Sequence, residues 1–121
     1  MIGQIGTAII GISMMMNVSV SDCVNDVEYW EQIGECRITE YCPACNDGGG
    51  HDSTSGKYLR AGHAACRWLP NGTIISIEGE EFEIVDTCGT DAIDIFRDSD
   101  SCRCNLNEYR KVSIKRKGLK Q

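Results

Sequence analysis

The chain has 121 residues, of which 25% are charged and 41% are hydrophobic, and this composition is ordinary for a single globular domain. Its formal net charge of −6 argues against nucleic-acid binding, because contacts with phosphates need clustered lysine and arginine. Basic side chains gather at the C-terminus, where we expect residues 117–121 to form a solvated basic tail.

The first segment, residues 1–21, contains no charged side chain. Its apolar run over residues 5–16 has the length of a signal-peptide core and is too short and glycine-rich for a membrane span. The positive residues that normally precede such a core are missing, since the first basic residue is Arg37. The eight cysteines also indicate export, so we expect a leader that is removed, with a buried first strand or helix as the alternative. The mature chain is expected to be secreted, attached to the cell wall or carried by a phage, without a stable membrane span.

Eight cysteines stand out in so short a chain. They are Cys23, Cys36, Cys42, Cys45, Cys66, Cys88, Cys102 and Cys104. An even number of cysteines in a short exported protein predicts a disulfide framework, although the sequence does not assign the pairs. The alternative is a zinc site on Cys42, Cys45, Cys66 and Cys88, because Cys42-Pro43-Ala44-Cys45 has ligand spacing. The spacing of the two cysteines in Cys102-Arg103-Cys104 is too short for a standard zinc knuckle. We therefore predict disulfides rather than a zinc site.

The remaining elements follow in chain order. Residues 22–36 form an acidic lead-in with a short turn of helix, which a Cys23–Cys36 pair would close. Residues 37–116 form the domain proper, with one short helical stretch capped by Asp98 or Ser99. Alternating, β-branched runs predict strands at residues 37–41, 73–77, 81–85, 92–96 and 112–114. Gly79 lies in the turn between the second and third of these runs and can take a positive φ. Short strands with glycine-marked turns predict a small all-β barrel or sandwich.

Three stretches carry motifs in a recognisable order. They are Thr39-Glu40-Tyr41-Cys42-Pro43 with Ser53-Thr54-Ser55-Gly56, then residues 64–73 with Leu69-Pro70-Asn71-Gly72-Thr73, and last Val85-Asp86-Thr87-Cys88-Gly89 with Ala92-Ile93-Asp94-Ile95-Phe96. This order resembles the three-aspartate (3D) domain of bacterial and phage cell-wall lytic enzymes, over residues 37 to about 115.

The resemblance implies a fold and a function. The fold would be a six-stranded double-psi β-barrel, here stapled by disulfides. The activity would be cleavage of peptidoglycan glycan strands, as a lytic transglycosylase or an O-glycosyl hydrolase, by a monomer without cofactor or metal. The implied catalytic residues are Asp94 and Asp86, and the implied substrate-binding residues are Tyr41, Thr54, Gly56, Thr87 and Gly89.

The residues themselves are consistent with this chemistry. Cleavage of a glycosidic bond needs a proton donor, and a carboxylic acid can donate near neutral pH only if burial or a like charge raises its pKa. Asp94 lies in an apolar strand, where alternation places it on the face of Ala92 and Phe96. Asp86 ends the preceding strand and would lie beside it, where its charge would keep Asp94 protonated. For Asp86 alone, ordinary turn chemistry is the competing explanation.

Departures from the family pattern leave a second function open. Ala65 and Cys66 occupy the region where the family has its first aspartate, and Cys88 replaces a glycine of the last turn. The alternative is therefore a non-catalytic barrel that binds wall polysaccharide, as expansin-like and barwin-like barrels are thought to do. We expect Trp68 and Tyr41 to pack in the barrel rather than stack on sugar rings. His51 and His63 are expected to be solvated loop residues.

Overall fold

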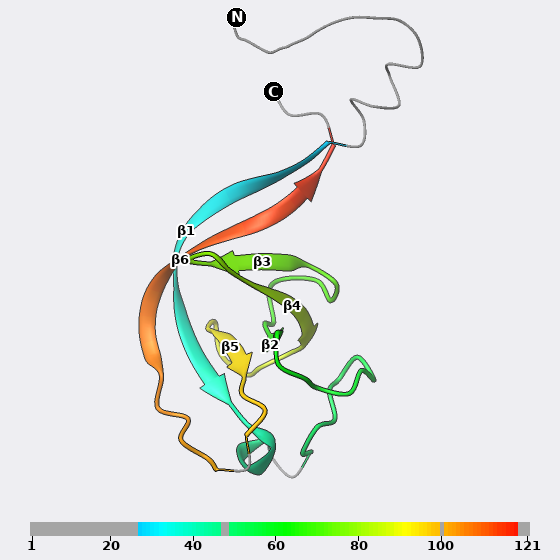
Figure 1. The fold of residues 1–121 in the computed structure, drawn as a ribbon, viewed down its shortest axis with the longest axis vertical. Helices are drawn as coiled ribbons and strands as arrows, with labels where there is room; N and C mark the ends of the chain where they lie inside the picture. The colour runs from blue at the N-terminus through cyan, green and yellow to red at the C-terminus, as the bar shows by residue number, and fades with distance from the viewer. Residues whose placement is uncertain (1–26, 47–48, 100, 119–121) are drawn as a thin grey trace, which may run out of the picture. The chain divides into compact units, whose positions relative to one another are not determined.

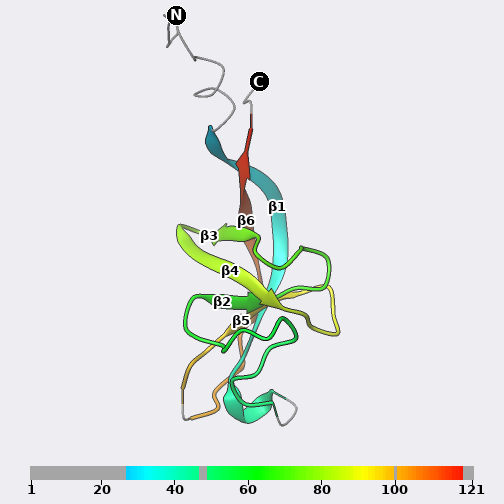
Figure 2. The ribbon, with the colours of Figure 1, turned by 90° about the vertical axis from the view of Figure 1, so that its right-hand side faces the viewer.

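A computed structural model describes residues 27–46, 49–99 and 101–118 of the chain (Figures 1 and 2). Its strands form a closed six-stranded barrel in the order β1-β5-β2-β4-β3-β6, and the prediction of an all-β barrel is confirmed. The strands are β1 (Glu28–Tyr41), β2 (His63–Ala65), β3 (Ile74–Ile77), β4 (Glu80–Asp86), β5 (Ile93–Phe96) and β6 (Asn107–Lys117). The pairs β1–β5 and β2–β4 are parallel, whereas β2–β5, β3–β4 and β3–β6 are antiparallel. The compact unit that carries the features discussed below is Trp30–Lys115.

Each of the five strands expected from the sequence is present, and the hairpin between β3 and β4 has the expected turn. Glu78 and Gly79 both have a positive φ, +52° and +92°. This is the backbone of a type I′ turn, whose twist matches that of the two flanking strands. The sequence missed β2, which is only three residues long and contains two alanines.

Two predicted helical segments are wrong. The helix in the described residues is the 3-10 helix η1 (Pro43–Cys45), not a helix capped by Asp98 or Ser99. The backbone beyond Ser99 is instead held by Glu40, whose carboxylate accepts hydrogen bonds from the N–H groups of Asn105 and Leu106. The described part of the lead-in, from residue 27 on, contains no turn of helix, because β1 already begins at Glu28. Residues 1–26, which include the expected leader and Cys23, lie outside the described part of the chain, where no helix is long and apolar enough to cross a membrane.

The core consists of two clusters on opposite sides of the sheet. The larger one packs Ile93 and Ile95 of β5 against side chains of all the other strands. The smaller one contains Tyr41, Leu59, Ala65, Val85 and Phe96. The expected alternation in β5 is therefore confirmed, since Ile93 and Ile95 face one cluster and Phe96 faces the other.

A β-bulge changes the side-chain order at the end of β4. Ala64 of β2 pairs with Ile84, but Ala65 pairs with Asp86, so Val85 is the extra residue. Strict alternation would place Asp86 with Phe82 and Ile84 on the face of the larger cluster. The bulge instead brings Asp86 to the side chain of Tyr41 on the other face, and re-aiming a side chain is a common role of such bulges.

Candidate functional site

Four strands contribute one residue each to a single row across the sheet. Ala65 of β2 is the register partner of Asp86 on β4 and of Asp94 on β5, and Asp94 in turn pairs with Thr39 on β1. Neighbouring strands lie about 4.8 Å apart, so the backbones of the two aspartates are separated by roughly 10 Å. The structure therefore places Asp86 and Asp94 on either side of Ala65. Ala65 lies in the region where the three-aspartate domain, which this sequence resembles, has its first aspartate.

Asp86 is held by four hydrogen bonds and is only 5% exposed. Its Oδ1 atom accepts bonds of 2.9 Å from the N–H and the hydroxyl of Thr54 and from the N–H of Thr87. Its Oδ2 atom accepts a bond of 3.1 Å from the hydroxyl of Tyr41. Burial, followed by the charge of Asp86, raises the pKa of Tyr41, so the phenol keeps its proton and remains a donor. With both oxygens engaged, Asp86 can position and polarise its surroundings but does not face a substrate.

Asp94 is more open and has a free oxygen. The hydroxyl of Thr39 donates to its Oδ1 atom at 2.8 Å, and among the described residues no group bonds to its Oδ2 atom. Burial raises the pKa of Asp94 above the ordinary value of 3.8, and the negative charges of Asp86 and Glu40 add to this effect. The hydrogen bond from Thr39 opposes the rise without cancelling it. Asp94 therefore combines a raised pKa with an oxygen that is available to a ligand, as a general acid requires.

The predicted substrate-binding residues take different places. Tyr41 is buried against Phe96, with ring centroids 5.3 Å apart, so the prediction that it packs is confirmed. Thr54 and Thr87 lie at Asp86 and hold its carboxylate. Gly56 lies two residues beyond Thr54 in an exposed loop, and Gly89 is exposed with its carbonyl accepting a bond from Arg67.

An open groove of about 700 Å³ is lined by none of the residues of this row. Its lining residues are Glu35, Cys36, Arg37, Arg67, Trp68, Thr90, Asp91 and Tyr109. The prediction that Trp68 packs in the barrel is wrong, because 43% of Trp68 is exposed. Its indole N–H donates to the carbonyl of Asp91 at 2.9 Å, and Arg67 pairs with the carboxylate of Asp91 at 2.6 Å, so the ring is fixed at the groove. Neither Asp86 nor Asp94 lines the groove.

The two histidines are less solvated than expected. His51 stacks on Tyr58 at 4.5 Å between ring centroids, and its Nε2 atom lies 2.9 Å from the carboxylate of Asp98. His63 is the first residue of β2 rather than part of a loop, and its Nδ1 atom accepts a bond from the N–H of Arg60. Neither ring contacts Asp94.

The expected disulfide framework is wrong for the described cysteines, all seven of which are free. The Sγ atoms of Cys42 and Cys45 are 3.6 Å apart, whereas a disulfide needs about 2.05 Å. The zinc site considered on the sequence is not assembled either. Cys66 is buried in the larger core cluster, and the thiol of Cys88 points to the carbonyls of Thr90 and Ala92.

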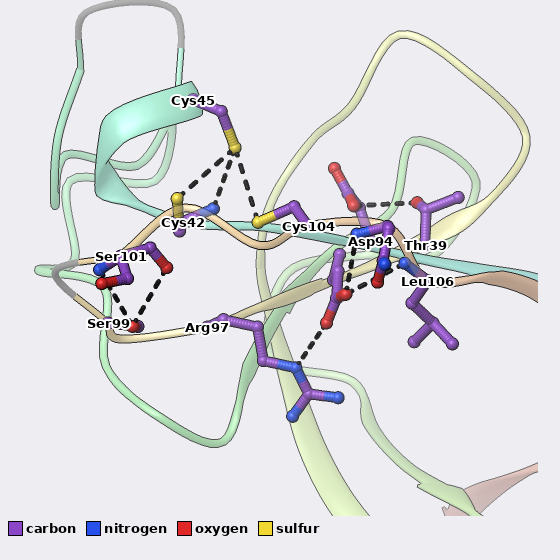
Figure 3. Close-up of polar contacts among 11 residues, drawn as sticks. Thr39, Cys42, Cys45, Asp94, Arg97, Ser99, Ser101, Cys104 and Leu106 are labelled. Atoms are coloured by element: carbon purple, nitrogen blue, oxygen red, sulfur yellow. Dashed lines mark hydrogen bonds and ion pairs between the residues drawn. The ribbon is translucent and has the colours of Figure 1, made fainter.

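A different set of cysteines converges. The Sγ atoms of Cys42, Cys45, Cys102 and Cys104 all lie within 4.8 Å of one another, and we call these residues the four-cysteine cluster. Three of them are seen in Figure 3, with the sulfur of Cys45 directed at those of Cys42 and Cys104. The sequence signal for this cluster lies in the motifs at residues 42–45 and 102–104, of which the second is tighter than a standard zinc knuckle.

Comparisons with protein-family models, with curated proteins and with solved structures find no match for this chain.

Proposed function

We propose that this protein cleaves the glycan strands of peptidoglycan, with Asp94 as the acid and base. The observation that carries the proposal is the environment of Asp94, a partly buried carboxyl group with a raised pKa, one anchored oxygen and one free oxygen. A raised pKa favours the protonated form of Asp94, which is the form that can donate a proton to the leaving oxygen.

In the lytic transglycosylase form of the reaction, the Oδ2 atom of Asp94 gives its proton to the glycosidic oxygen as the bond from that oxygen to the anomeric carbon breaks. A hydroxyl of the same sugar then attacks the anomeric carbon, and its proton returns to Asp94. The products are an alcohol and an internal anhydro sugar, and no water is consumed. Thr39 orients the carboxyl group, while Asp86 acts as a positioning residue through its charge and its bond to Tyr41.

The resemblance to the three-aspartate domain supports this proposal. The closed barrel of six strands with mixed pairing is compatible with a double-psi barrel, which we take as the finer description of the fold. The two aspartates carried over from the motifs lie in one row of the sheet. By the same resemblance, the protein would act as a monomer on the cell wall, outside the cytoplasm or delivered by a phage.

The groove favours a second function, binding of wall polysaccharide without cleavage. Trp68 and Tyr109 expose aromatic rings at the groove, and the charged side chains of Arg37, Glu35 and Asp91 lie beside them. Exposed rings flanked by hydrogen-bonding groups suit the apolar faces and hydroxyl edges of sugars. This groove does not include Asp94, and Ala65 leaves the row with two carboxylates instead of three.

Incubation of purified peptidoglycan with the wild-type protein separates the two functions. The enzyme should release soluble glycan fragments over time, at substoichiometric protein. Protein that sediments with the wall and releases no fragments would contradict the enzyme and support the binding module.

The rate of release should depend on pH through Asp94. Activity is expected to fall as the pH rises through the raised pKa of Asp94, because the donor must carry its proton. Asp86→Asn removes a like charge that contributes to this rise, so the alkaline limb of its profile should move to lower pH. Initial rates of fragment release across the pH range give the alkaline limb for the wild type and for Asp86→Asn. Identical alkaline limbs in the two proteins would show that Asp86 does not raise the pKa of Asp94.

Trp68→Ala should weaken sedimentation with the wall. Loss of one stacked ring removes about 1 kcal/mol, which corresponds to roughly fivefold weaker binding. Trp30→Ala is the matched control, because Trp30 is 41% exposed but does not line the groove. Equal binding by both variants would exclude the groove as the polymer-binding surface.

A further inference from the structure

The four-cysteine cluster joins two segments that are far apart in the sequence. Cys42 directly precedes the 3-10 helix that follows β1, and Cys45 is the last residue of this helix. Cys102 and Cys104 lie in the connection between β5 and β6. Cys42 is completely buried, Cys104 is partly buried, and the other two are exposed. The site of glycan cleavage proposed above uses none of these side chains.

The spacing of the sulfur atoms is that of ligands around one ion. The Sγ atom of Cys45 lies 3.6 Å from that of Cys42 and 3.7 Å from that of Cys104. Four sulfurs bound to zinc at about 2.3 Å in a tetrahedron are about 3.8 Å apart. These two distances match this value and are far longer than the 2.05 Å or so of a disulfide bond, and the other pairs of sulfurs lie within 4.8 Å.

Hydrogen bonds of the backbone hold each half of the cluster in place. The N–H of Cys45 donates to the carbonyl of Cys42, and the N–H of Cys42 donates to the Sγ atom of Cys45 at 3.2 Å. The second half is held by Glu40, which accepts bonds from the N–H groups of Asn105 and Leu106. Hydrogen bonds to ligand sulfurs and an anchored scaffold are typical surroundings of a metal centre.

The charges around the cluster also suit a bound cation. Four thiolates in contact would repel one another strongly, and a divalent ion would leave a net charge of −2. Glu40, Arg97 and Arg103 line a cavity of about 370 Å³ together with Cys104. Arg97 is paired with Glu40 at 2.8 Å, so Arg103 is the positive side chain that can offset this excess charge.

We propose that Cys42, Cys45, Cys102 and Cys104 bind one zinc ion as a closed, structural centre. Thiolates are soft ligands that prefer zinc among the abundant divalent ions, and four protein sulfurs leave no open position for a substrate or an activated water. Binding converts the thiols to thiolates and releases their protons to solvent. The ion would fasten the β5–β6 connection to the end of β1, directly after Tyr41, whose hydroxyl bonds to Asp86.

Metal analysis of the full chain, purified under reducing conditions, tests the proposal. One zinc per chain is expected, and replacement by Co²⁺ should give the visible and charge-transfer bands of tetrahedral cobalt thiolate. Protein that contains no metal and gives no such bands with Co²⁺, or whose mass shows that the four cysteines are oxidised to disulfides, would overturn the proposal. Iron in place of zinc would overturn the assignment of the metal.

Matched serine variants locate the ligands. Cys102→Ser exchanges an exposed residue and should weaken Co²⁺ binding by more than about 100-fold, since even the loss of a group that only supports a ligand costs 10–100-fold. Cys88→Ser is the control and should bind Co²⁺ like the wild type, because Cys88 lies outside the cluster. Unchanged Co²⁺ binding by Cys102→Ser, or equal losses in both variants, would overturn the assigned ligand set.

Discussion

Asp94→Asn is expected to lower the rate of glycan-fragment release by about 10²–10⁴-fold, the usual contribution of a general acid. The asparagine amide keeps the size of the side chain and can still accept the hydrogen bond from Thr39, but it has no acidic proton for the leaving oxygen. Because burial raises the pKa of Asp94, the change also removes a group that is costly to ionise. The variant should therefore fold at least as well as the wild type while losing activity.

Asp52→Asn is the control for this change. It makes the same exchange of aspartate for asparagine at an exposed position away from the row of Asp86 and Asp94. Its rate should equal that of the wild type, and thermal unfolding should give similar midpoints for all three proteins. Full activity of Asp94→Asn would remove Asp94 from the mechanism.

Asp86→Ala is expected to lower the free energy of unfolding by about 3–5 kcal/mol, as is usual when a buried network of charged hydrogen bonds is broken. The alanine leaves the buried hydroxyl of Tyr41 and the N–H groups of Thr54 and Thr87 without their acceptor. Each unsatisfied buried group costs about 1–3 kcal/mol. Water can partly reach the exposed Thr54 and Thr87, so the loss of stability should be smaller than the sum of the costs for fully buried groups. Equilibrium unfolding in urea measures the loss.

Asp86→Asn separates the hydrogen bonds from the charge. Its amide oxygen can still accept from Thr54 and Thr87, and its amide nitrogen can donate to the oxygen of Tyr41, so its destabilisation should be clearly smaller. Equal stability of the wild type and Asp86→Ala would show that this network does not hold the turn after β4. A loss in Asp86→Asn as large as that in Asp86→Ala would assign the stability to the negative charge itself.

Most strands of this barrel can be predicted from the sequence because apolar and polar side chains alternate along them. Ile93 and Ile95, like the pattern of β4 up to Ile84, follow the two-residue period and face the core as expected. β2 was not predicted, since three residues with two alanines carry too little hydrophobic signal and its pairing is set by β4 and β5. Among the described residues no helix follows Asp98, and the hydroxyl of Ser99 bonds locally to the carbonyl and the N–H of Ser101.

The sequence predicted that Asp86 and Asp94 lie near each other, but not the hydrogen bonds and burial that distinguish the two carboxyl groups. The apolar neighbours of Asp94 indicated an unusual carboxyl group, and its surroundings in the barrel raise its pKa. The burial of Asp86 depends on a bulge at Val85 that no local pattern reveals. The cysteines show the same limit, because which thiols meet depends on where the β5–β6 connection runs past the end of β1. Counting cysteines predicted disulfides, whereas the fold gathers four free thiols.

The most direct test of glycan cleavage by Asp94 is mass spectrometry of the soluble fragments that wild type and Asp94→Asn release from the same purified peptidoglycan. The proposed mechanism predicts fragments from the wild type with anhydro ends, one water lighter than the products of hydrolysis, and almost none from Asp94→Asn. Wild-type protein that releases no fragments, or the same fragments at the same rate from both proteins, would contradict it.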